Sequence, residues 1–75
     1  MPKYPVIKAK NLARALLRAG FYIHHQTGSH VRLLHSSRKD LRITIPMHNF
    51  DIPIETLQRI LKQADLGVED LLKLL

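Results

Sequence analysis

The sequence predicts an α+β fold of order αβββα, with two helices on one face of a three-stranded antiparallel sheet and a short helix at the end. Three observations support this prediction. Apolar residues recur at helical spacing before residue 20 and after residue 53. Between them, three segments alternate apolar and polar residues, as strands with one buried face do. The length of 75 residues suits one domain, residues 1–75, with one small core.

Helical spacing predicts a first helix over residues 8–19, and Gly20 supplies its stop. A second helix is expected to begin near Asp51, which suits an N-cap, and Pro53, which tolerates the first turn. A last short helix should follow Gly67. The apolar residues expected on the three buried helix faces are Ala9, Leu12, Ala13, Leu16 and Ala19, then Ile54, Leu57, Ile60, Leu61 and Ala64, and finally Val68, Leu71, Leu72 and Leu75.

The expected strands are residues 21–26, 31–35 and 41–45. Their inward register holds the apolar residues together with His25 and His35, which we interpret as partly buried structural histidines. The outward register leaves one sheet face open. We interpret that face as a phosphate-binding surface, with an ordinary polar outer face as the alternative. Its expected members are Tyr22, His24, Gln26, His30, Arg32, Arg42 and Thr44.

Gly28, Ser29 and His30 are predicted to form a tight turn between the first two strands. Glycine tolerates the positive φ of a hairpin turn, and serine is a common turn residue. His30 should therefore stand at the start of a strand, beside solvent. Because histidine titrates near neutral pH, this position suits a catalytic group. The alternative interpretation is a polar surface residue.

The charge balance predicts an anionic partner. Twelve Lys and Arg stand against six Asp and Glu, which gives a formal net charge of +6. Nucleic acid is the first candidate, and an acidic protein is the second. The absence of cysteine excludes disulfides and thiolate metal sites. No apolar run approaches the ~18 residues of a membrane span, and no signal-peptide pattern is present. We expect a cytoplasmic protein without a membrane partner.

The chemistry that the sequence favours needs no cofactor. Catalytic zinc requires three converging ligands, whereas His24 and His25, adjacent in a strand, are expected to point to opposite faces. If the nucleic acid is RNA, its ribose 2′-hydroxyl can serve as the nucleophile once a histidine removes the hydroxyl proton. General acid–base help of this kind contributes roughly 10²–10⁴-fold. An arginine of the open face would stabilise the charge on the phosphoryl oxygens. For the second proton-transfer group, His24 and Lys39 both stay open.

Several segments, taken in order, resemble the HicA family of toxins, the ribonuclease half of a bacterial or archaeal toxin–antitoxin pair. The matching pieces cover nearly the whole chain and are residues 16–21, Gln26-Thr27-Gly28-Ser29-His30, Thr44-Ile45-Pro46-Met47-His48 and residues 56–64. Two positions depart from the family pattern. Thr27 replaces a common basic residue, which puts one phosphate contact in doubt. Asp65 replaces a glycine, and aspartate enters the left-handed region at modest cost.

The resemblance implies a double-stranded-RNA-binding-like fold, cleavage of messenger RNA and a partner antitoxin, HicB. It also implies that His30 is the catalytic group. Two other functions stay open, namely a non-catalytic RNA-binding module of the same fold and an interaction protein whose basic surface meets an acidic partner. The residues expected to contact RNA are Gly28, Ser29, Arg32, Arg42 and His48.

Overall fold

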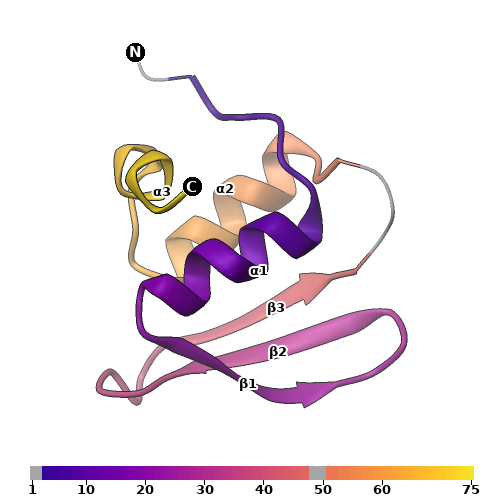
Figure 1. The fold of residues 1–75 in the computed structure, drawn as a ribbon, viewed down its shortest axis with the longest axis vertical. Helices are drawn as coiled ribbons and strands as arrows, with labels where there is room; N and C mark the ends of the chain where they lie inside the picture. The colour runs from indigo at the N-terminus through magenta and orange to yellow at the C-terminus, as the bar shows by residue number, and fades with distance from the viewer. Residues whose placement is uncertain (1–2, 48–50) are drawn as a thin grey trace.

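A computed structural model describes residues 3–47 and 51–75 of the chain (Figure 1). The elements follow the predicted order and are α1 (Ala9–Arg18), β1 (Phe21–Gln26), β2 (His30–His35), β3 (Arg42–Pro46), α2 (Ile54–Gln63) and α3 (Val68–Leu74). The strands form one antiparallel sheet in the order β1-β2-β3. Helices α1 and α2 cover one face of this sheet, and α3 packs against α1 (Figure 1). The predicted α+β fold is confirmed.

The core lies between the two long helices and the sheet. Among the described residues, every buried side chain is hydrophobic. Four apolar residues expected to be buried are exposed, namely Ile23, Ile54, Leu72 and Leu75. In the short α3, the inward side is set by the spacing of three from Val68 to Leu71, and the half-buried Leu74 continues it. Leu72 therefore falls on the outward side. Ile54 is the first residue of α2 and is 58% exposed.

Two helix ends differ in how well the sequence predicted them. Gly20 follows α1 with a φ of +100°, a conformation that favours glycine, so the predicted helix stop is confirmed. The prediction that Asp51 caps α2 is wrong, because the N-cap is Pro53. Asp51 instead pairs with Lys8 in an isolated antiparallel bridge, and the Ile52 amide donates to the Ile7 carbonyl at 2.9 Å. This pairing holds the chain extended, so α2 begins only after Pro53.

A β-bulge in β1 changes which side chains share the open face. Ile23 pairs with Leu33, but the next pair is His25 with Arg32, so His24 is the extra residue. The bulge resets the alternation of the strand. His25 therefore lies in the outward register, and Gln26, which pairs with Val31, lies in the inward one. The predicted faces of His25 and Gln26 are both wrong for this reason, and both residues are exposed.

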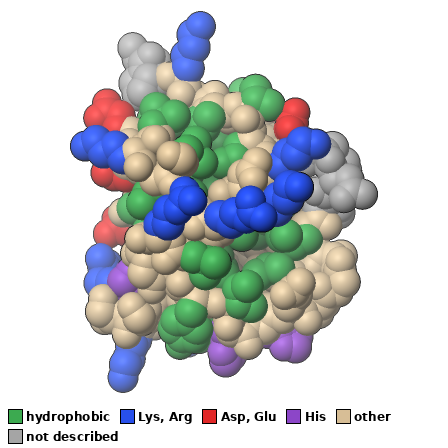
Figure 2. All heavy atoms as spheres, viewed as in Figure 1, with side chains coloured by type: hydrophobic (Ala, Val, Ile, Leu, Met, Phe, Trp, Pro, Cys, Tyr) green, Lys and Arg blue, Asp and Glu red, His purple; other side chains and the backbone are tan. Residues whose placement is uncertain are grey.

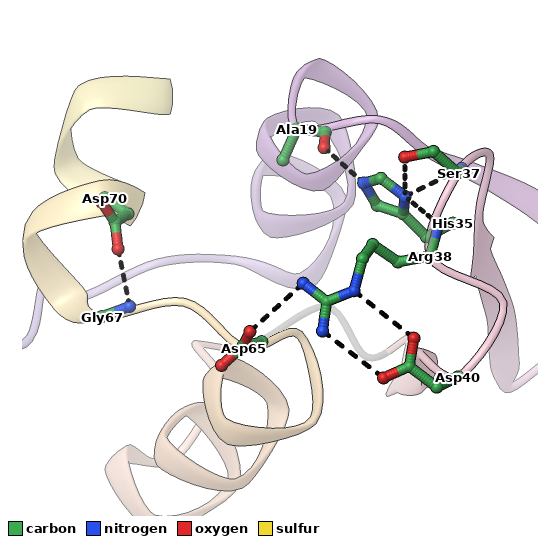
Figure 3. Close-up of polar contacts among 8 residues, drawn as sticks. All are labelled: Ala19, His35, Ser37, Arg38, Asp40, Asp65, Gly67 and Asp70. Atoms are coloured by element: carbon green, nitrogen blue, oxygen red, sulfur yellow. Dashed lines mark hydrogen bonds and ion pairs between the residues drawn. The ribbon is translucent and has the colours of Figure 1, made fainter.

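His35 joins the end of α1 to the connection between β2 and β3 (Figure 3). Its Nδ1 accepts hydrogen bonds from the amides of Ser37 (3.1 Å) and Arg38 (3.0 Å). Because two donors face Nδ1, the proton of the neutral ring lies on Nε2, which donates to the Ala19 carbonyl at 2.9 Å. The ring also meets Phe21 edge to face, with centroids 4.8 Å apart. The half-buried structural role predicted for His35 is confirmed.

Arg38 connects the same loop to the end of α2 (Figure 3). Its guanidinium lies 3.4 Å from carboxylate oxygens of both Asp40 and Asp65. The hydrogen bond from Arg38 lowers the pKa of Asp40. Asp65 has a φ of +58°, so it occupies the left-handed region that an aspartate enters at modest cost.

Candidate nucleic-acid interface

The first hairpin turn is held by its own side chains. The Thr27 amide donates to the His30 carbonyl at 2.9 Å, and the His30 amide donates to the Thr27 hydroxyl at 3.1 Å. Gly28 and Ser29 are thus the two residues of the loop. The Met47 amide donates to the Ser29 carbonyl at 2.7 Å, which ties the turn to the end of β3. His30 is therefore presented from a turn fixed on both sides.

Gly28 is not required by the backbone geometry. Its φ lies outside the left-handed region, so the expectation of a positive φ is wrong. The Thr27 side chain closes the turn in place of the backbone bond that a positive φ would favour. Within residues 3–47 and 51–75, no atom lies within 4 Å of a Cβ added at Gly28. The glycine leaves open space next to the Ser29–His30 pair.

The imidazole of His30 is exposed and oriented by its neighbour. Its Nδ1 lies 3.0 Å from the Ser29 hydroxyl oxygen. Within residues 3–47 and 51–75, Nε2 has no hydrogen-bond partner, so it is the ring nitrogen open to a ligand. If Nδ1–H donates to the hydroxyl, Nε2 is free to accept a proton.

His30 and the two predicted arginines lie on the same face of the sheet. The exposed residues of β2 alternate with buried ones, which places His30 and Arg32 on the side away from the helices. Arg32 pairs with Thr44, and Leu34 pairs with both Tyr22 and Arg42. A broad hollow of about 740 Å³ opens on this face. It is lined by Tyr22, His24, Arg32, Leu34, His35, Ser36, Lys39, Arg42, Thr44 and Gln63.

The structure brings together part of the predicted site. Arg32 and Arg42 line one hollow, and so do both candidates for the second proton-transfer group, His24 and Lys39. His24 thus shares the outer face with His25, contrary to the expected opposite orientations. His30 lies outside this hollow, at the start of β2. His48 lies outside the described residues.

Sequence reasoning missed two members of the outer face. Leu34 had been assigned no role there, although its pairing with Tyr22 and Arg42 places it between them. His25 was assigned to the other face because no glycine or proline marks the bulge. A polar His-His pair in an otherwise alternating strand was the available signal.

A second basic surface follows α1. Figure 2 shows Lys and Arg side chains gathered over this helix, whereas histidines appear at the sheet below it. Lys10, Arg14 and Arg18 are exposed residues of α1. Arg18 also has a structural role, since its guanidinium donates to the Leu74 carbonyl at 2.6 Å and so fastens α3 to α1.

Residues 3–47 and 51–75 contain no group of three or more His, Asp or Glu side chains placed to hold one ion. No helix in this part of the chain is both long and apolar enough to cross a membrane.

Comparison with known protein families gives a match over most of the chain. The model of the family described as the HicA toxin of bacterial toxin–antitoxin systems matches residues 9–66. This span runs from the start of α1 to the residue before Gly67 and includes the whole sheet. A search of the curated proteins finds no significant match.

Proposed function

Because this chain belongs to the HicA family of toxins, we propose that it acts as an endoribonuclease that cuts messenger RNA, with His30 as its general acid–base group. One observation carries the proposal. The exposed imidazole is oriented through Nδ1 by Ser29 and stands at the end of the sheet face that holds Arg32 and Arg42. A proton acceptor on the same sheet face as two arginines suits a phosphodiester substrate.

The proposed reaction uses the 2′-hydroxyl of the RNA as nucleophile. Nε2 of His30 takes the hydroxyl proton as the 2′-oxygen bonds to the adjacent phosphorus. The bond from phosphorus to the 5′-oxygen breaks, and that oxygen receives a proton from a second group. The products are a 2′,3′-cyclic phosphate and a 5′-hydroxyl end. The step needs no metal ion, because the substrate supplies the nucleophile and a side chain supplies the base.

Ser29 is a positioning residue in this mechanism. By accepting the Nδ1 proton, its hydroxyl selects the tautomer in which Nε2 can take a proton. His24 is the candidate for the second group, since it lines the hollow and its bulge lies beside the His25–Arg32 pair, close to His30. Lys39 follows β2 at the end opposite His30, about 16 Å along the strand, so it lies too far away to act on the same phosphate. Arg32 or Arg42 stabilises the negative charge that develops on the phosphoryl oxygens, because the planar guanidinium group matches the geometry of phosphate.

The family pairing implies an antitoxin as partner, and we propose a HicB-like protein that binds over His30. A formal charge of +6 attracts an acidic partner and raises its association rate. Inhibition is most direct when the partner covers the group that performs the chemistry. We place the complex and its messenger RNA substrate in the cytoplasm.

The test is cleavage of a defined single-stranded RNA by the purified protein, with and without a metal chelator. We expect cleavage in both conditions, with cyclic phosphate and 5′-hydroxyl ends. RNA with methylated 2′-hydroxyls should resist. Cleavage of the methylated RNA, or loss of activity in the chelator, would contradict the mechanism. Binding without any cleavage would favour a non-catalytic RNA-binding module instead.

A further inference from the structure

Tyr22 has the environment of a ligand contact rather than that of a core residue. Its side chain lies on the outer sheet face and is 45% exposed. Across the described residues, its hydroxyl has no hydrogen-bond partner, whereas tyrosines that serve packing are covered and usually paired. The ring borders the same hollow as Arg32 and Arg42.

We propose that this hollow binds an unpaired nucleotide of the RNA, whose base stacks on the Tyr22 ring while its phosphate lies against Arg32 or Arg42. The inference rests on the proposed function and adds a substrate class to it, which is single-stranded RNA. Stacking on an aromatic ring combined with arginine contacts to the backbone is the general chemistry of single-strand binding. Leu34, opposite Tyr22, adds an apolar wall for the base.

The strand geometry sets where this nucleotide lies relative to the cut. His30, Arg32 and Leu34 follow one another on one face of β2, and Tyr22 lies beside Leu34. Four residues of strand span about 13 Å. Even with its bases stacked at about 3.4 Å per nucleotide, RNA covers this distance in about four nucleotides. The stacked base should therefore lie within about four nucleotides of the scissile bond.

The same geometry disfavours a duplex. In an A-form helix each base is stacked between its neighbours and is hidden from a protein side chain. Tyr22 stands on a strand within an open sheet, where only an unpaired base can reach its ring face. The hollow is thus a device that selects unpaired segments of a message.

The experiment measures binding of a labelled single-stranded RNA by fluorescence anisotropy, in a His30→Ala background so that the RNA stays intact. We expect Tyr22→Ala to weaken binding by about 5- to 150-fold, the range for loss of one stacked base. Tyr22→Phe should stay within about twofold, because it keeps the ring. Ile54→Ala is the matched control, an exposed apolar residue outside the hollow, and should change nothing.

A substrate scan keeps the test decisive if Tyr22→Ala does not fold. In the same His30→Ala background, with Tyr22 intact, one abasic position within about four nucleotides of the cut should weaken binding, and a duplex of equal length should compete poorly. Equal binding by Tyr22→Ala, or no sensitive abasic position, would overturn the inference even if wild-type protein cuts RNA. Conversely, Tyr22-dependent binding by a wild-type protein that never cuts RNA would leave the inference standing and refute the proposed ribonuclease.

Discussion

Replacing Gly20 by alanine should destabilise the fold by about 2–3 kcal/mol, and replacing Gly28 should change its stability by less than about 0.5 kcal/mol. At Gly20 the φ of +100° costs an L-residue about 1–2 kcal/mol. The new Cβ would also stand 2.7 Å from Nε2 of His35. The ring must move, which breaks its hydrogen bond to Ala19 and costs a further ~1 kcal/mol. Gly28 has neither constraint.

Urea unfolding, followed by circular dichroism, measures both costs. Adding Gly20→Ala to a His35→Ala protein separates the two costs. With the ring already removed, the further loss of stability relative to His35→Ala alone should be only the backbone cost of about 1–2 kcal/mol. Equal stability of the Gly20→Ala and Gly28→Ala proteins would refute the assignment of Gly20 as a conformational requirement. If Gly20→Ala lowers the stability by the same amount with and without the His35 ring, the contact between the new Cβ and that ring contributes nothing, and that part of the reasoning is refuted.

Gly28→Ala, which should leave the stability unchanged, should nevertheless slow RNA cleavage. A methyl group at Gly28 fills open space beside His30 without disturbing the fold, so it should displace the substrate and slow cleavage by up to about a hundredfold. The assay is the initial rate of RNA cleavage under conditions in which both variants are folded. Full activity of Gly28→Ala would mean that the RNA does not approach this turn closely.

Three further outcomes are expected. In a plot of log K for RNA binding against log salt concentration, Arg32→Ala or Arg42→Ala should each make the slope about 0.7 less steep, whereas Arg14→Ala should leave it unchanged. A slope that changes with Arg14→Ala and not with the two sheet variants would place the RNA on α1. Asp40→Asn should lower the free energy of unfolding near neutral pH, because the hydrogen bond from Arg38 lowers the pKa of Asp40 in the folded protein. This difference from wild type should vanish as the pH falls through the folded-state pKa of Asp40. A difference that persists at lower pH would contradict the Arg38–Asp40 ion pair as its cause. An acidic antitoxin should bury His30 and still bind the His30→Ala protein; a complex with His30 open to solvent would exclude inhibition by occlusion.

The element order was predictable because it depends on period alone. Helical spacing through Leu12 and Leu16, and alternation through Val31 and Leu33, each fix one buried face. The bulge at His24 was not predictable in this way, since neither glycine nor proline marks it and the pairing partner decides it. The cap at Asp51 failed for a similar reason, because a bridge to a residue more than forty positions away outweighed its local preference.

The candidate site divides in the same manner. The outward positions of Arg32 and Arg42 followed from the alternation of their strands, and the structure places both on one hollow. The contact from Ser29 to the His30 ring could not be read from the sequence, because it depends on a rotamer within the turn. The expected positive φ at Gly28 failed because the Thr27 hydroxyl closes the turn instead.

The most direct test of the account compares RNA cleavage by the wild-type, His30→Ala and His25→Ala proteins at matched concentration. His25 is the control, an exposed histidine on the same sheet face with no place in the mechanism. The free energy of unfolding of the His30→Ala protein should lie within about 0.5 kcal/mol of the wild-type value, because the residue is exposed. Its rate of RNA cleavage should fall by at least about a hundredfold. The His25→Ala protein should cut RNA at close to the wild-type rate. A folded His30→Ala protein that cuts RNA as fast as wild type would contradict the central claim.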